Sequence, residues 1–403
     1  MPPSTIAAIQ APAASLAKPV ELTLFGLCVA NALYLVFALL HGTILVGADG
    51  LPIPTDFVNV WAGGRVALEG QAAAAYDAVA HKAAQVAALG RDFAGEYPWV
   101  YPPTFFFAAA PLAMLPLTAA HVAWVAMTFA AFAAVMVAIM RGPVGLVMAC
   151  AFPGIVANAS VGQNGFLTAA LIGGMLIVLN SRPLLAGILL GLLSFKPHFG
   201  VLIPLVLIAG GYWRVLFAAA ATTLLLALAA WLVFGFEVWE GFFDALRSAS
   251  QAALSLGLAD WSKLQSLFGL VRILGGGETL AFVLQWMLAG ATGLLLCLLW
   301  RSRAPFNLKA AGLAVGILLV PPYLFMYDDV TLAVAMAFLF REMQARGALP
   351  GEQAGLGAAL LLVLIFPIVK VPVGFDATLV VALLIARRTD MDSGFAPFGR
   401  APE

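Results

Sequence analysis

Charged residues are scarce in this chain. Aspartate, glutamate, lysine and arginine make up 10% of its 403 residues, whereas 63% are hydrophobic, and the mean hydropathy is +1.02. A soluble domain carries about 25% charged residues. Because so apolar a chain cannot cover itself with water-facing groups, we expect lipid to be its solvent.

Neither sign of charge is in excess, since 20 basic residues balance 20 acidic ones. No basic patch stands out, so nucleic acid is not an expected partner. The three cysteines, Cys28, Cys150 and Cys297, each lie inside an apolar run and form no CxxC or Cys/His metal spacing. We interpret them as small core residues.

Motifs that bind nucleotides or activate hydrolytic nucleophiles are also missing. The chain has no GxxxxGK[ST], HExxH or GxSxG, and no GxGxxG in a strand context. Asp49 and Asp56 are too far apart for a DxD-like ligand pair. We therefore expect no cofactor and no metal, and any activated group must come from the membrane.

What the chain does have is a succession of apolar runs. A membrane helix needs roughly 20 apolar residues, and shorter or broken helices are tolerated inside a bundle or beside a watery cavity. The candidate segments are 22–47, 101–116, 119–140, 144–157, 165–179, 184–195, 199–211, 214–234, 279–300, 308–321, 329–340, 355–370 and 376–386.

Lysine and arginine in short loops predict the orientation, because these loops favour the cytoplasm. The basic positions are Arg182, Arg214, Arg301, Arg303, Lys309, Arg341, Arg346, Arg387 and Arg388. A cytoplasmic location for all of them leaves 47–100, 158–164, 196–198, 235–278, 321–328 and 370–375 on the outer side. Both ends are then cytoplasmic only if one segment does not span. We choose 101–116, which contains four prolines, and count twelve spans.

The predicted fold is therefore all-α and polytopic, with residues 1–403 as one transmembrane domain. Residues 1–20 do not resemble a secretory signal, and the run from Leu22 is too long for one, so we expect it to stay uncleaved. The first outer loop, 47–100, has apolar periodicity at 56–69 and 71–89, typical of two interfacial helices. The second, 235–278, carries Trp239 and Trp261, which favour the interface.

Asp56 follows Pro54 and Thr55 at the start of the first amphipathic stretch. An acid there is explained by the helix dipole and by capping. A carboxylate at the membrane face also suits a general base, which must lie within hydrogen-bond reach of the hydroxyl that it deprotonates.

Lys196-Pro197-His198 interrupts a long apolar stretch at the tip of a predicted hairpin. About 18 Å of helix separates Leu184 from Lys196, less than a hydrocarbon core of about 30 Å. The lysine is either snorkelling or paired with an anion such as a lipid phosphate. His198 is better explained as a polar pocket residue than as a metal ligand.

Three other polar groups also allow two interpretations. Gly162-Gln163-Asn164-Gly165 is either a plain polar turn or a turn that offers donors and acceptors to a ligand. Of Asp328 and Asp329, which follow Tyr327, one is explained by an N-cap, and the other would orient a substrate hydroxyl or pair with Lys196. The second outer loop contains either an interfacial helix or further phosphate and sugar contacts, through Lys263, Gln265 and Arg272.

Six of these motifs, in order, resemble glycosyltransferase family 87. They are Thr55-Asp56-Phe57 with Trp61-Ala62, Gly70 and Tyr76-Asp77; Tyr101-Pro102-Pro103 before Pro111 and Pro116; Gly162-Gln163-Asn164; Ala186-Gly187 with Lys196-Pro197; Trp213-Arg214; and Pro322-Tyr323 with Tyr327-Asp328. The resemblance extends over about residues 20–388. The chain departs from the family pattern at Met326 and Asp329, which flank Tyr327-Asp328.

The resemblance implies a C-type glycosyltransferase fold and transfer of a mannose-like hexose or a pentose from a polyprenyl-phosphate sugar. It implies that Asp56 is the base and that Lys196 and Gln163 line the donor pocket. The acceptor would be a lipid or glycan, the protein a monomer, and the membrane a bacterial inner membrane with the site facing the periplasm. The alternative is a polytopic transporter or flippase, although we find no matching halves of the kind that transporters often show.

Overall fold

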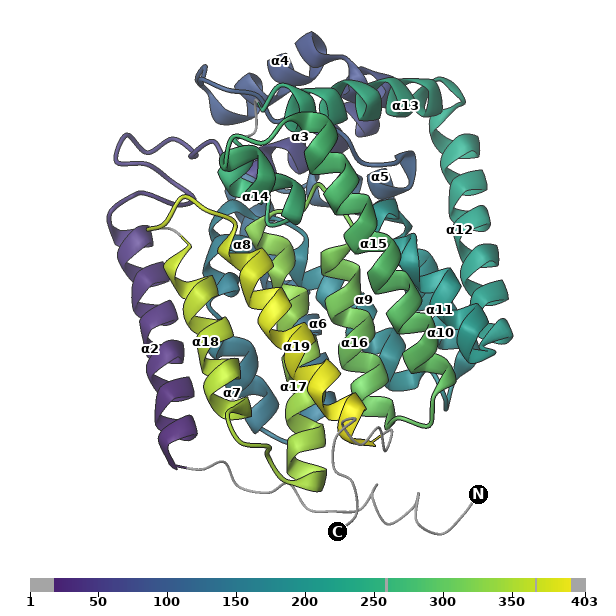
Figure 1. Ribbon diagram of the computed structural model, residues 1–403. Coiled ribbons are helices and arrows are strands. Elements are labelled where there is room, and N and C mark those ends of the chain that lie inside the picture. Colours follow the sequence, from purple (N-terminus) through teal and green to yellow (C-terminus); the bar gives the residue numbers. More distant parts are fainter. Residues whose placement is uncertain (1–17, 258–259, 367, 393–403) are drawn as a thin grey trace, which may run out of the picture.

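The computed structural model describes residues 18–257, 260–366 and 368–392, and within them it is built entirely from helices (Figure 1). Eighteen α-helices, α2 to α19, are assigned in these ranges, with two isolated β-bridges and no named strand. The all-α prediction is confirmed. A single large hydrophobic cluster runs through the bundle, from Phe57 to Ile385.

Four helices are long and apolar enough to cross a membrane: α2 (Lys18–Leu40), α6 (Leu117–Met140), α12 (Trp213–Phe234) and α15 (Glu278–Arg301). Their 22 to 24 residues extend over about 33–36 Å, enough for a hydrocarbon core. The pair α7 (Val144–Ala151) and α8 (Gly154–Val161) passes the same test together, with a bend of 69°. The chain is therefore a multi-pass membrane protein, and the count of twelve stays a prediction.

Shorter helices form the centre of the bundle: α9 (Gly165–Val178), α16 (Phe306–Leu319) and α17 (Val330–Arg346). Every residue from Ala310 to Leu319 is buried, as is every residue from Val330 to Leu339. A helix that is apolar on all sides is buried on all sides. The remaining helices of the bundle are α10 (Pro183–Leu192), α11 (Leu202–Gly210), α18 (Glu352–Ile365) and α19 (Val373–Asp392).

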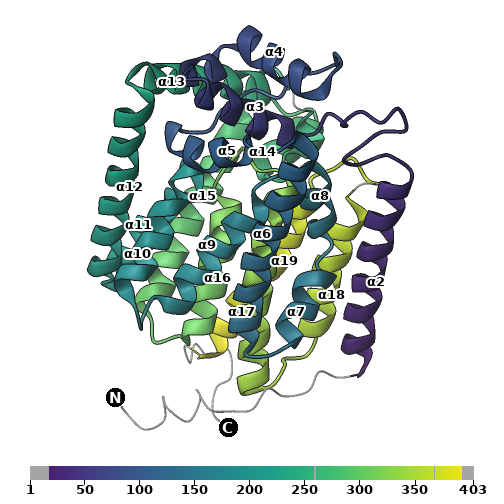
Figure 2. The ribbon, with the colours of Figure 1, turned by 180° about the vertical axis from the view of Figure 1, so that it is seen from behind.

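The peripheral helices present large apolar side chains outward. Figures 1 and 2 show α2 and α12 at opposite edges of the bundle. Phe25 and Leu33 of α2 and Phe217 and Leu224 of α12 are 63–69% exposed. So much exposed apolar surface is out of place in water and suits contact with lipid.

One end of the bundle, which we call the capped end, carries helices that lie across it (Figure 1). They are α3 (Asp56–Leu68), α4 (Ala78–Leu89), α5 (Phe106–Leu112), α13 (Glu237–Ser250) and α14 (Leu267–Ile273). Helices thus occupy the two periodic stretches predicted in the first outer loop. The seven-residue α5, which packs against α3, is about 10 Å long and too short to cross a membrane.

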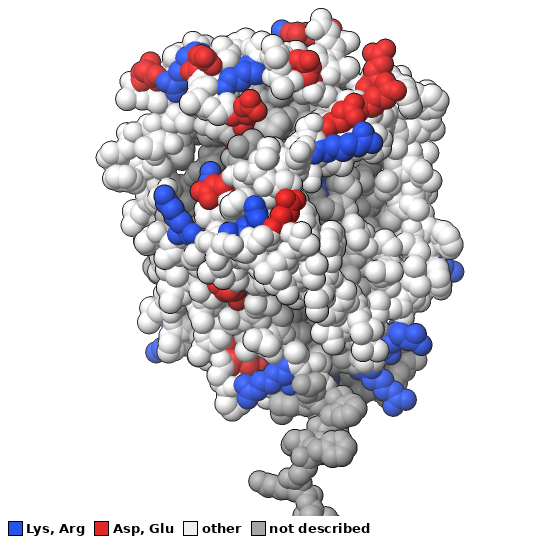
Figure 3. Space-filling model, turned by 45° about the horizontal axis from the view of Figure 1, so that its top comes forward, with Lys and Arg blue, Asp and Glu red and all other residues white. Residues whose placement is uncertain are grey.

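Charged side chains gather at the two ends of the bundle. Figure 3 shows them gathered over the capped end and at the opposite end, with an almost uncharged flank between them. Such a belt is expected where lipid tails contact a protein.

Candidate functional site

Helix α3 fixes the position of Asp56 at the capped end. Thr55 is extended (φ −134°) and Asp56 is the first helical residue, where a carboxylate is favoured by the helix dipole. Next to it, Phe57 is fully buried and stacks on His121 at 4.9 Å. Asn59 and His81 are hydrogen-bonded at 2.8 Å, which ties α3 to α4. The carboxylate is thus carried by a well-anchored helix.

A chain of hydrogen bonds begins at Asp56. Its Oδ2 accepts from Nε2 of Gln163 at 2.9 Å, and Oε1 of Gln163 accepts from the Tyr101 hydroxyl at 3.2 Å. Nδ2 of Asn164 donates to the same hydroxyl at 2.9 Å. Three segments far apart in the sequence therefore meet at one polar network.

The surroundings of this network shift the pKa values of Asp56 and Tyr101. Burial raises the pKa of Asp56 above its usual range, while the hydrogen bond from Gln163 and the positive charge of Lys263 partly lower it. Burial also raises the pKa of Tyr101, and the charge of Asp56 adds to this. Asp56 is thus a carboxylate of increased basicity, the property expected of a general base.

The turn from Gly162 to Gly165 brings the network together. Gly162 ends α8 with φ +68°, and a Cβ there would come within 2.6 Å of the Phe57 Cβ. A Cβ on Gly165 would come within 1.9 Å of the Tyr327 carbonyl oxygen. Oδ1 of the fully buried Asn158 accepts from the Gly165 N–H at 2.8 Å. The two glycines therefore let one turn touch both α3 and the segment around Tyr327.

Lys196 and Asp328 form a buried ion pair. Their side chains are only 7% and 4% exposed. The Lys196 ammonium also lies 5.3 Å from the centre of the Tyr327 ring. Since a buried charge needs a partner, Asp328 neutralises Lys196, which was predicted either to snorkel or to pair with an anion such as a lipid phosphate. Of the two interpretations of Asp328, the structure shows the pairing with Lys196.

Asp329 is completely buried, and neither of its carboxylate oxygens has a hydrogen-bond partner among the described residues. A Cβ on Gly374 would come within 2.0 Å of its Oδ2, so α19 closes over the carboxylate. It is packed inside the protein rather than open to a substrate.

The second outer loop contributes groups with different surroundings. Gln265 is fully buried: its amide donates to the Ser262 and Lys263 carbonyls and accepts from the Gly374 N–H, so it holds the backbone together. Arg272 lies over the Trp261 ring at 4.0 Å and donates to the Gly276 carbonyl. Lys263, in contrast, is exposed.

The structure brings some of the predicted residues together and leaves His198 apart from them. Asp56, Gln163 and Asn164 lie in one network, and Lys263 interacts with it electrostatically. His198 is next to Phe199, with ring centres 4.5 Å apart, and no hydrogen bond joins it to that network in the described part of the chain.

Sequence reasoning did not include two tyrosines in the site. Tyr101 lies at the centre of the network, and its Tyr-Pro-Pro motif was the available signal. Tyr323 is the second: burial raises its pKa, and the nearby charges of Asp56 and Asp328 raise it further. It lies in the Pro322-Tyr323 motif of the family pattern.

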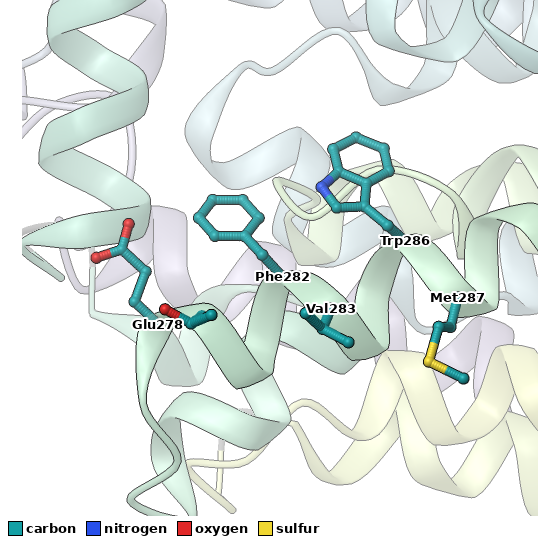
Figure 4. Close-up of a pocket in the computed structure, with 6 residues that line it drawn as sticks. Glu278, Phe282, Val283, Trp286 and Met287 are labelled. Carbon is teal, nitrogen blue, oxygen red and sulfur yellow. The ribbon is translucent and has the colours of Figure 1, made fainter.

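An open groove of about 620 Å³ lies along the capped end of α15 (Figure 4). Its lining residues recur every four positions, so two ridges of the helix form its floor: Glu278, Phe282 and Trp286, and Thr279, Val283 and Met287. Phe282 also belongs to the hydrophobic cluster that contains Leu264, Tyr323 and Phe325. This cluster connects the groove to the surroundings of the polar network.

Fold and composition define a multi-pass membrane protein, and comparison with known proteins gives its family. The model of glycosyltransferase family 87 matches residues 99–322, more than half of the chain, so the chain belongs to glycosyltransferase family 87. Asp56 and Asp328 lie outside the matched residues. No curated protein and no solved structure matches the chain.

Proposed function

We propose that this glycosyltransferase moves a mannose-like hexose or a pentose from a polyprenyl-phosphate sugar to a lipid or glycan acceptor, with Asp56 as general base. One observation carries the proposal: a carboxylate of raised pKa stands at the capped end, partly buried and hydrogen-bonded to Gln163. The donor arrives already activated, which agrees with the missing nucleotide motifs.

The chemistry is a single displacement in this proposal. The acceptor hydroxyl oxygen attacks the anomeric carbon, its proton passes to Asp56, and the bond to the phosphate oxygen breaks. The electron pair leaves with the polyprenyl phosphate. A retaining double displacement needs a second carboxylate as nucleophile. Asp328 is paired with Lys196 and Asp329 is enclosed, so inversion is the expected outcome.

The leaving phosphate gains negative charge and needs a cation. Lys263 is the best-placed candidate, because its side chain is exposed and its charge acts on Asp56. Arg272 is a second. We assign Gln163, Asn164 and Tyr327 to the sugar side. Lys196, Asp328 and Gln265 support these groups from behind, and His198 contributes only to the surroundings of Lys196.

The groove on α15 is the proposed seat of the prenyl chain. All six of its lining residues lie on α15, which presents Val283, Trp286 and Met287 outward, each at least 50% exposed. A prenyl chain is apolar and arrives from lipid, so a groove that opens to the lipid-facing flank is a suitable path. From there the cluster around Phe282 and Tyr323 leads toward Asp56.

For the membrane we propose the bacterial inner membrane, with twelve crossings, the capped end in the periplasm and a monomeric protein. The short helices supply the crossings beyond the four long helices and the bent pair α7 and α8, and the burial of α9, α16 and α17 inside the bundle supports this for the central ones. The basic loops then lie in the cytoplasm.

Transfer from a defined donor tests the function. Purified protein in liposomes is given polyprenyl-phosphate mannose, and glycosylated lipids are measured by mass spectrometry. We expect product from the wild type and a decrease of about 10²- to 10⁴-fold for Asp56→Asn, the usual contribution of a general base.

The matched control is Glu96→Gln, because Glu96 is an exposed acid in the same loop. It should retain wild-type activity. Full activity of Asp56→Asn would remove Asp56 as the base. Movement of the donor across the membrane without any glycoside product would instead support the transporter.

A further inference from the structure

A second groove lies at the opposite end of the bundle, where α10 and α12 begin. Its volume is about 810 Å³. The lining residues are Arg182, Pro183, Leu184, Leu185, Arg214, Phe217 and Ala218. Figures 1 and 2 place the first turns of α10 and α12 far from α3 and α14, so this groove is separate from the candidate site.

The groove combines positive charge with apolar surface. Arg182 and Arg214 are both exposed, and neither forms an ion pair with another of the described residues. The dipoles of α10 and α12 add positive potential, because both helices have their N-termini here. Leu184 and Phe217, 65% and 67% exposed, continue the groove along the flank.

The walls of the groove are held in place by close helix packing. A Cβ on Gly187 would come within 2.4 Å of the Ala218 Cβ, and one on Gly191 within 2.4 Å of the Thr222 Cβ. Small residues at these two positions let α10 and α12 approach closely. The groove is therefore set by the backbone of two packed helices and does not depend on a flexible loop.

We propose that this groove binds one anionic phospholipid. Its phosphate lies between the guanidinium groups of Arg182 and Arg214, which suit planar recognition of phosphate oxygens. One acyl chain follows Leu184 and Phe217 along the flank. A free phosphate ion would leave this apolar wall uncovered. This lipid site is separate from the proposed site of sugar transfer, and lipid binding here does not depend on that reaction.

Lipid retention by the purified full-length protein tests the proposal. The protein in detergent is titrated with dioleoyl phosphatidylglycerol or dioleoyl phosphatidylcholine, and bound lipid is counted by native mass spectrometry. We expect one tightly held phosphatidylglycerol and clearly weaker binding of the zwitterionic lipid. Each arginine near an anionic headgroup contributes about fivefold, so Arg182→Gln/Arg214→Gln should weaken binding by about 25-fold.

The matched control is Arg301→Gln/Arg303→Gln, which removes two exposed arginines at the same end but outside the groove. It should bind phosphatidylglycerol as the wild type does. Equal binding of the two lipids, or equal losses in both double variants, would overturn the proposal. Thermal melting shows whether each variant is folded. The charge reversal Arg214→Glu is a second test variant, and it should abolish the preference for phosphatidylglycerol over phosphatidylcholine. Displacement of the lipid by soluble glycerol phosphate at similar concentration would also contradict an acyl-chain contact.

Discussion

At the scale of single residues, the pKa of Asp56 connects the structure to pH dependence. A general base works only when deprotonated, so activity falls as pH drops through its pKa. Burial raises that pKa and Lys263 lowers it in part. Removing the lysine charge in Lys263→Met should therefore raise the pKa again and move the acidic limb of the kcat/KM profile to higher pH.

The control for this shift is Lys370→Met, since Lys370 is an exposed lysine in the loop between α18 and α19 and is not among the groups that affect Asp56. Its acidic limb should coincide with that of the wild type. An unchanged limb in Lys263→Met, or a shift to lower pH, would contradict the assignment.

The buried pair of Lys196 and Asp328 leads to a prediction about stability. Removing one partner leaves an unpaired buried charge, which typically destabilises a protein by about 3–5 kcal/mol. Lys196→Met should therefore lower the free energy of unfolding strongly. Lys196→Met/Asp328→Leu should recover most of it, because an apolar pair of similar volume needs no charge compensation. Denaturation followed by tryptophan fluorescence compares the variants. A double variant less stable than the single one would show that the charges are needed together.

At the scale of elements, the turn between α8 and α9 lies against both α3, which carries Asp56, and the segment around Tyr327. In Gly165→Ala the added Cβ would overlap the Tyr327 carbonyl oxygen, 1.9 Å away. We expect a loss of about 1–3 kcal/mol, the usual effect of overpacking, together with reduced transfer. Melting temperature and transfer rate are measured together.

Gly142→Ala is the comparison for this turn, because a Cβ there meets nothing within 4 Å and φ is not positive. Its melting temperature and transfer rate should match those of the wild type. If Gly165→Ala behaved in the same way, the close contact between α9 and Tyr327 would not be important.

The elements also show how far the sequence predicts the fold and the site. Apolar runs longer than 20 residues predicted α6, α12 and α15 well, since length and hydropathy are local properties. The periodicity of 56–69 located α3. The hydrogen bond between Asp56 and Gln163 connects residues 107 positions apart, and no local pattern contains it.

The same limit applies to the predicted donor pocket. Lys196 looked like a lone cation because its partner Asp328 is 132 positions away. Gln265 looked available because its three backbone partners become visible only in the folded protein. The chemical types of the site residues were predictable. Which of these residues form ion pairs or hydrogen bonds inside the folded protein was not.

At the scale of the whole molecule, the division of charge between the two ends predicts sidedness. In a protein whose three native cysteines are replaced by serine, Glu96→Cys in intact cells should react with a membrane-impermeant maleimide. Arg303→Cys should react only after the membrane is permeabilised. The opposite pattern would place the capped end in the cytoplasm and contradict the proposed orientation.

The central claim is that a lipid-borne sugar meets Asp56 at the capped end, and a structure with bound donor tests it most directly. The Asp56→Asn protein, mixed with polyprenyl-phosphate mannose, should hold the donor intact. We predict the sugar beside position 56, with room for an acceptor hydroxyl within about 3 Å of that side chain, the phosphate near Lys263, and the prenyl chain along Phe282 and Trp286. A donor bound elsewhere, with the sugar out of reach of position 56, would contradict the account.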